Sequence, residues 1–196
     1  MATLASLKAD LNTRLNDAAN TIWPDAEKVL FVSDAVGSLF PNFFKAKTGT
    51  STASAGPVQT GPTGVINIHY IGVQSASATR VRVIRGWSEG YGDAIVPKVN
   101  ILGQTLVWGW SEAYAVPAST STALEVPAPG LEVARLRAEI SAFEQVLGSR
   151  TKTQKYLAVQ VREGVSESEM VAHLDALHAS VESRLKLQPP LPTRVG

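Results

Sequence analysis

The spacing of apolar residues changes twice along this chain of 196 residues, and that change constrains the fold more than any other feature. Near both ends, apolar side chains recur every three or four residues, which is the period of an amphipathic helix. In the middle they alternate with polar side chains, which is the period of a strand. The order predicts two groups of helices with a β module between them.

Two helices are predicted in the first part of the chain. The first has one apolar face, made of Leu4, Leu7, Leu11 and Leu15. The second begins at Pro24, a residue favoured in the first helical position, and the acidic residues that follow suit the positive end of a helix dipole. Its apolar face consists of Val29, Val32, Val36, Leu39, Phe40 and Phe43. Pro41 is expected to end the regular helix at about Phe40.

Helices return in the last third of the chain. The first of them has an apolar face made of Val133, Leu136, Ile140, Phe143 and Leu147. Gly148 follows it as the expected C-cap. The last helix starts with a capping box formed by Ser166 and Glu169. Its buried face consists of Met170, Leu174, Leu177, Val181 and Leu185. Residues 155–164 are compatible with either a strand or a short helix.

The segment 45–63 consists almost entirely of Ser, Thr, Gly, Ala and Pro. Such a segment buries too little apolar surface to offset the entropy that it would lose on ordering. We therefore expect a mobile loop over these residues. A loop of this length inside a domain is uncommon, and it is usually either functional or disordered.

Four strands are predicted in the middle of the chain. The side chains that share an apolar face are Ile66, Ile68 and Tyr70 in the first strand, Val81 and Val83 in the second, Ile95, Val99 and Ile101 in the third, and Leu106, Trp108 and Trp110 in the fourth. Arg80 and Arg82 are expected to point outward, and a turn at Gly103–Gln104 suits a hairpin. No helical pattern separates the strands, so the sheet is expected to be antiparallel.

These segments predict an α+β fold, mainly a helical bundle with an inserted antiparallel β-sheet or small sandwich. One domain would cover residues 1–187, with its helices in 1–44 and 128–187 and its β insertion in 64–126. Residues 188–196 would form an extended C-terminal tail.

The composition excludes several classes of protein. There is no cysteine, which rules out disulfides, thiolate zinc sites and cysteine nucleophiles, and favours a reducing compartment. The 18 basic and 17 acidic residues are spread evenly, without the basic surface of a dedicated nucleic-acid binder. No apolar run is long enough to span a membrane, and the N-terminus lacks the pattern of a signal peptide. We expect no membrane association.

One short pattern matches a catalytic motif. The sequence GWSEG at 86–90 has the spelling of a nucleophile elbow, with Ser88 at its centre. That elbow needs a strand, a sharp turn and a helix on a parallel sheet, whereas another strand is predicted here. Asp93 and either His173 or His178 follow in a permissible order, but the α/β scaffold is absent. The preferred interpretation is a hairpin loop, and we expect no enzyme activity and no cofactor.

The three histidines do not have the spacing of a metal site. His173 and His178 are five residues apart on a predicted helix, which places them away from a common face. His69 stands alone in a predicted strand. We expect ordinary surface or interface histidines and no metal site.

Carboxylates and aromatic residues occur close together in the β module, as they do in sugar-binding sites. The carboxylates are Glu89, Asp93 and Glu112, and the aromatic residues are Trp87, Tyr91, Trp108 and Trp110. Because Trp108 and Trp110 share a face with Leu106, a buried packing face is preferred to a sugar platform. Exposure of the tryptophans would favour the alternative, a carbohydrate-binding β module on a helical base.

Three stretches of the chain together resemble the head–tail connector adaptor proteins of long-tailed bacteriophages. They read LNTRLNDAANTIWPDAEKVLFVSDAVGSLFPNFF, TRVRVIRGW with the later LVWGWSEAYAVP, and PAPGLEVARLRAEISAFEQVLGSR. The resemblance is one of pattern and order over most of residues 1–187, without a catalytic motif. The segment 45–63 departs from the family pattern.

The resemblance implies a structural virion protein of the neck, located at the capsid vertex and made in the host cytoplasm. Such adaptors form a ring, usually of twelve copies, below the portal protein. The ring extends the DNA channel and docks stopper or tail-terminator proteins, and genomic DNA passes through it without sequence recognition. Another neck component, a tail terminator or a stopper, is the near alternative.

The resemblance also implies a partner for the C-terminal tail, because this segment of adaptors commonly reaches the portal. Its prolines forbid a helix and favour an extended polyproline-type path. The apolar side chains and the arginine of the tail would supply contacts once it docks. The expected portal-binding residues are Leu187, Pro189, Pro190, Leu191, Pro192, Arg194 and Val195.

Overall fold

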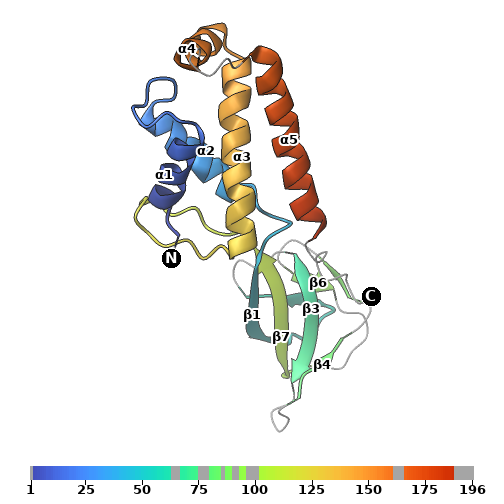
Figure 1. Cartoon of the computed structure of the whole chain (residues 1–196). Coiled ribbons are helices and arrows are strands. Elements are labelled where there is room, and N and C mark those ends of the chain that lie inside the picture. Colours follow the sequence, from blue (N-terminus) through green and yellow to red (C-terminus); the bar gives the residue numbers. More distant parts are fainter. Residues whose placement is uncertain are drawn as a thin grey trace. The chain divides into compact units, whose positions relative to one another are not determined.

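The computed structural model divides the chain into two compact units. It describes residues 2–62, 67–74, 80–84, 87–89, 93–95, 102–160 and 166–187. One unit comprises Met1–Phe43 and Tyr114–Gln188, and the other includes Phe44–Ala113. Within the described residues the first unit is helical and the second is built of strands, which confirms the α+β class (Figure 1).

The helical unit is organised around one central helix. Its elements are α1 (Leu4–Arg14), α2 (Asp25–Gly37), α3 (Ala128–Leu147), α4 (Arg150–Gln160) and α5 (Glu167–Lys186). Figure 1 shows α3 between α2 and α5, and α3 contacts each of the other four helices. The stretch that was compatible with a strand or a helix is therefore helical up to Gln160.

The predicted apolar faces form the core of the helical unit. The buried residues among them are Leu4, Leu7, Leu11, Leu15, Val32, Val36, Leu39, Phe43, Val133, Leu136, Ile140, Phe143, Met170, Leu177 and Val181. Gly148 is the C-cap of α3, and Ser166 and Glu169 form the predicted capping box of α5. Val29 is only half-buried, whereas its neighbour Lys28 is fully buried.

A buried ion pair holds the connection between α1 and α2. Lys28 is 0% exposed and Asp17 is 3% exposed, and Nζ of Lys28 lies 3.0 Å from Oδ2 of Asp17. Lys28 also donates to the carbonyl of Asp17 and to Oδ1 of Asn20. The Asp17 carboxylate accepts hydrogen bonds from the backbone N–H groups of residues 21–23. Both charges are therefore paired and hydrogen-bonded, as burial requires.

The same connection carries Trp23 into the core. Its indole N–H donates to the carbonyl of Ala142 at 3.1 Å. Its ring packs edge-on against Phe143 and Tyr156, with centroids 6.4 and 6.0 Å away. This aromatic cluster joins the α1–α2 connection to α3 and α4.

The β unit contains two antiparallel sheets within its described residues. The four-stranded sheet has the order β1 (Lys45–Thr52), β7 (Thr105–Glu112), β3 (Ile68–Gln74) and β4 (Arg82–Val83). The three-stranded sheet has the order β2 (Val58–Thr60), β6 (Asp93–Ile95) and β5 (Ser88–Glu89). β7 is paired on both sides, and its apolar face of Leu106, Trp108 and Trp110 is buried as predicted.

The prediction of a mobile loop over 45–63 is wrong where β1 and β2 form. β1 pairs with β7 along its whole length, from Lys45 opposite Glu112 to Thr52 opposite Thr105. Its low apolar content does not prevent this, because β7 supplies the buried side chains and the ladder satisfies the backbone of β1. Alternate side chains of β1 are half-buried and exposed.

The boundaries of the β module differ from the predicted 64–126 at both ends. The β unit begins at Phe44 and ends at Ala113. Residues 114–126 belong to the helical unit, where Leu124 and Val126 join its core.

A β-bulge changes the predicted face of β3. The register shifts between Ile68 and Tyr70. Ile68 is buried as expected, but Tyr70 lies over Gly109 on the opposite face, where a Cβ atom would come within 2.1 Å of its ring. Ile71 and Val73 take the buried positions instead, because one extra residue reverses the alternation of the strand.

The predicted inward direction of Val81 and Val83 is also wrong. These side chains are 40% and 47% exposed, and the buried residue of this segment is Ile84. β4 is only two residues long and pairs with β3 alone, and Val81 lies against Gly72. Gly103 has the positive φ of a turn. Ile66, Val99, Ile101 and the side chain of Ile95 lie outside the described residues.

Removal of one partner of the buried ion pair should strongly destabilise the helical unit. Lys28→Met leaves the Asp17 carboxylate buried without its counter-charge, which should cost about 3–5 kcal/mol of unfolding free energy. Lys8→Met removes a more exposed pair with Asp25 and is the matched control, with an expected loss of about 1 kcal/mol or less. Urea unfolding followed by near-ultraviolet circular dichroism measures both, and equal losses would contradict the argument from burial.

Asp17 should also make stability depend on pH. Burial raises its pKa, but hydrogen bonds from Trp23, Lys28 and residues 21–22 outweigh this effect and leave the pKa below its ordinary value of 3.8. A lowered pKa in the folded state means that the stabilisation is complete above 3.8 and is lost as the pH falls through the folded value. When the free energy of unfolding is measured against pH, the Asp17→Asn variant should lose less stability below pH 3.8 than the unchanged protein. An equal loss in both proteins would refute the role of Asp17 in this pH dependence.

Candidate functional site

Charged side chains from three helices converge on Glu139 of α3. The Glu139 side chain is 6% exposed. Its Oε2 lies 3.2 Å from Nη1 of Arg14 at the end of α1, and its Oε1 lies 3.2 Å from Nε2 of His173 on α5. One buried carboxylate thus links α1, α3 and α5, which are far apart in the sequence.

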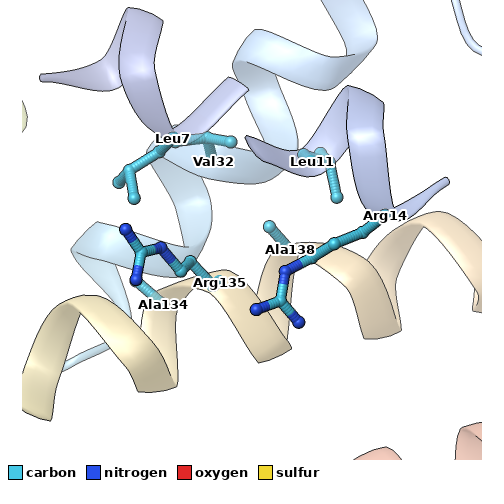
Figure 2. Close-up of a pocket in the computed structure, with 7 residues that line it drawn as sticks. All are labelled: Leu7, Leu11, Arg14, Val32, Ala134, Arg135 and Ala138. Atoms are coloured by element: carbon cyan, nitrogen blue, oxygen red, sulfur yellow. The ribbon is translucent and has the colours of Figure 1, made fainter. Parts of the chain in front are cut away.

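Close packing of α1 against α3 positions Arg14. Figure 2 shows the crevice between them, which is lined by Leu7, Leu11, Arg14, Val32, Ala134, Arg135 and Ala138. The small side chains of Ala134 and Ala138 face the leucines of α1, and the two arginines extend along the crevice. Nε of Arg135 lies 2.8 Å from Oδ2 of Asp10, so this crevice is closed by ion pairs as well as by apolar contact.

An open pocket of about 370 Å³ lies beside the partners of Glu139. Its lining residues are Arg14, Phe143, Tyr156, Glu169, Met170 and His173. Phe143, Tyr156 and Met170 are buried and form an apolar floor, and the His173 ring packs edge-on against Phe143 at 5.1 Å. An apolar concavity with a few polar groups is the usual form of a binding pocket.

Glu169 supplies a negative charge at this pocket. Its Oε2 accepts hydrogen bonds from the backbone N–H and the hydroxyl of Ser166, at 2.6 and 2.9 Å. These bonds favour the charged form and lower the pKa of Glu169. The pocket therefore has a cation, Arg14, and an anion, Glu169, beside an aromatic floor.

A second open pocket, of about 380 Å³, lies between α2, α3 and α5. Arg137 lines it and donates to the carbonyl and the hydroxyl of Ser38, at the C-terminal end of α2. Burial lowers the pKa of Arg137. Because this arginine caps α2 and Asp34 lines the same pocket, the arrangement is explained by the packing of the helices.

The requirements of a nucleophile elbow are not met at Ser88. This residue lies in β5 and is paired with Ile95 of β6 in an antiparallel sheet. The side chains of Ser88, Glu89 and Asp93 lie outside the described residues. His173 and His178 each pair with a glutamate of α3, the second with Glu144 at 3.6 Å.

The tryptophans of the β unit are buried and do not form an exposed platform. Trp108 is 0% exposed, Trp110 6% and Trp87 9%. The indole N–H groups of Trp108 and Trp110 donate to Oγ of Ser51 and to Oε1 of Glu112. These rings therefore belong to the core of the β unit, as the preferred interpretation of the sequence expected. Tyr91 lies outside the described residues.

Within the described residues, no group of three His, Asp or Glu side chains could hold a metal ion. His69 contacts the ring of Phe44, with centroids 5.6 Å apart. In the same part of the chain, no helix has the length and apolar character needed to cross a membrane.

The expected portal-binding residues begin at the end of α5. Leu187 is its C-cap and is 79% exposed. The other six, Pro189, Pro190, Leu191, Pro192, Arg194 and Val195, lie outside the described residues.

The pairing of Glu139 with Arg14 is not predicted by the sequence. A local signal exists for Glu139, because it follows Leu136 by three residues and precedes Ile140, which places a charge at the edge of an apolar helical face. No local signal exists for Arg14, because its partner is 125 residues away.

Glu139→Gln should weaken the contact between α1, α3 and α5. The amide keeps the shape but removes the buried negative charge between Arg14 and His173, and a hydrogen bond to a charged group contributes about 1.5–3 kcal/mol. Glu144→Gln is the matched control, because Glu144 faces His178 with 55% of its side chain exposed and should cost less than about 0.5 kcal/mol. Thermal and urea unfolding compare the two, and similar losses would refute a special role for Glu139.

A scan of the chain against protein-family models gives no match, and a search of curated proteins gives no significant relative.

Proposed function

We propose that this chain is a head-to-tail adaptor of a long-tailed bacteriophage, which forms a ring below the portal protein. The order of its elements carries the proposal. The β unit is inserted in the sequence between α2 and α3, and two early helices and three late ones form one helical unit. The resemblance to the adaptor family implies two early helices, a β insertion and a late pair of helices, and this chain has that order with three late helices.

The surface of α5 supports a role in assembly. Of its 20 residues, only Met170, Leu177 and Val181 are buried, and α5 packs against α3. Leu174 and Leu185 are half-buried against the same core, and the other side chains of the helix are exposed, including Val171 at 44%. A specific interface typically buries more than about 1,000 Å², and an exposed helix of this length can contribute a large share of it.

In the proposed ring, each copy contacts two identical neighbours through different surfaces, as a closed heterologous ring requires. The ring would hold about twelve copies, the usual number in the family that the chain resembles. Its partners would be the portal and the stopper or tail-terminator proteins. DNA would pass through the channel without base recognition, consistent with a net charge of only +1.

A stopper or a tail terminator is the nearest alternative, because these neck proteins also assemble as rings. A carbohydrate-binding module is less well supported, since the three described tryptophans that would stack on a sugar are buried.

Native mass spectrometry tests the adaptor proposal. The chain of 20.8 kDa should bind the portal protein of the same source as a ring, with one copy per portal subunit. Without the portal, the mass spectrum should show either the monomer or the complete ring and no other assembly. A matched mixture with an unrelated portal serves as the control, because specific docking requires a complementary surface. Single copies that fail to bind their own portal would contradict the proposal.

A further inference from the structure

We propose that the outer edge of β1 in one copy of this chain pairs with the outer edge of β4 in the next copy, so that the four-stranded sheets of neighbouring subunits join. The inference rests on the proposed ring, because it assigns one of the contacts between its subunits. β1 and β4 are the two outer strands of one antiparallel sheet, and within the described residues each is paired on one side only. Figure 1 shows them at opposite edges of that sheet.

β1 has the features of an edge strand that is open to a partner. It pairs with β7 over eight residues without a shift in register, and it contains no proline. Charge protects only its first half, because no charged residue follows Lys47 in the strand. Nζ of Lys47 also lies 3.5 Å from Oε2 of Glu112, which offsets its charge. A long, regular edge without bulges, prolines or charges is a template for the addition of another strand.

The backbone groups on the outer side of β1 belong to its exposed residues. The N–H of Ala53 donates to the carbonyl of Gln104 at 2.9 Å. In an antiparallel ladder, residues that bond to the partner strand alternate with residues that face away from it. The residues of β1 that face away from β7 are therefore Ala46, Thr48, Thr50 and Thr52. All four are exposed, and within the described part of the chain their outward backbone groups make no hydrogen bond.

The outer edge of β4 offers matching groups. The N–H of Ile84 donates to the carbonyl of Ile71 at 2.8 Å. By the same alternation, the backbone groups of Val81 and Val83 face away from β3. These two valines are also 40% and 47% exposed, so an apolar surface accompanies the free backbone groups. Both would be covered by a strand that pairs with this edge.

The valines of β4 and the threonines of β1 lie on the same face of the sheet. Val83 is opposite Gly72, which is opposite Val107 on β7. Val107 is opposite Thr50 on β1. Residues directly opposite each other on neighbouring strands share a face. When β4 pairs with β1 of the next copy, its valines can therefore meet threonine methyl groups, and pairs of β-branched side chains suit a sheet surface.

The direction of the contact follows from the order of the strands. β1 and β3 run one way, and β7 and β4 run the other way. A neighbour generated by rotation about an axis along the strands keeps the direction of its β1, so β4 and that strand are antiparallel. Pairing their outward groups places Val83 opposite Thr48 of the next copy and Val81 opposite Thr50.

Charge selects this register. It places Arg82 opposite Gly49, which has no side chain. A shift by two residues in one direction would place Arg82 opposite Lys47, and like charges directly opposite each other are destabilising. The same shift in the other direction would carry Arg80 beyond Thr52, where β1 ends.

Disulfide trapping tests this contact in the full-length protein, with and without the portal. The chain has no cysteine, so engineered thiols are the only ones present. A double variant carries Thr48→Cys in β1 and Val83→Cys in β4. Within one copy, three strand spacings of about 4.8 Å place these positions about 14 Å apart, too far for a disulfide. Each disulfide therefore joins two copies, and mild oxidation should give a series of covalent dimers, trimers and larger multimers on non-reducing electrophoresis.

The matched control combines Thr48→Cys with Val58→Cys. Val58 is 48% exposed, as Val83 is, but it lies in β2 of the other sheet. The variant with the β4 thiol should give about tenfold more covalent trimer and larger multimer than this control, because a disulfide needs Cα atoms within about 7 Å.

Thr50→Pro, added to the first double variant, should lower the yield of multimers severalfold. The N–H that it removes faces away from β7, so the ladder between β1 and β7 is kept while the contact with the next copy loses a donor. Thermal unfolding checks that this variant is folded.

Equal series from the two double variants would overturn the inference. So would the absence of a series in a sample whose native mass spectrum shows the ring on the portal. A covalent dimer from Thr48→Cys alone would also overturn it, because two β1 edges would then face each other about a two-fold axis.

These results leave the adaptor proposal intact, since that proposal depends on the mass of the complex with the portal. Conversely, a series of multimers from a protein that does not bind its portal would support this contact and refute the adaptor. A sample with neither the ring nor the series would refute both.

Discussion

The buried ion pair between Asp17 and Lys28 is the interaction on which the helical unit depends. It joins the end of α1 to the start of α2 in a site without solvent, where an unpaired charge would cost several kcal/mol. The connection that it orders delivers Trp23 to Phe143 and Tyr156. Through this cluster, the first two helices are attached to α3 and α4, which follow them only after the β unit.

The central helix α3 combines this apolar attachment with a polar one. Phe143 contacts Trp23 and Tyr156, and also the ring of His173. Glu139, one helical turn before it, pairs with Arg14 and His173. The two residues thus hold α1 and α5 beside the pocket with an aromatic floor. Phe143 therefore both belongs to the core of the helical unit and lines this pocket.

The insertion of the β unit between α2 and α3 gives the chain two separate hydrophobic cores. Its core of Trp108, Trp110 and neighbouring aliphatic residues is distinct from the core of the helical unit. A unit with its own core can be carried between two helices without interrupting their packing. In the proposed ring, the two units would supply different surfaces of one chain, as a heterologous ring requires.

The sequence by itself determined the features that depend on local periodicity and capping. These were the leucine face of α1, the apolar face of α3, the capping box at Ser166 and the shared face of Trp108 and Trp110. Only the tertiary structure decided the features whose partners are distant. β1 has no apolar signal of its own and forms because Lys45–Thr52 pairs with β7, about sixty residues later. Likewise, His173 is a half-exposed histidine as expected, but its pairing with Glu139, 34 residues earlier in the chain, has no local signal in the sequence. A periodic pattern indicates which face of an element is apolar. Which strands pair and which charges are buried depend on the residues that distant parts of the chain place against that element.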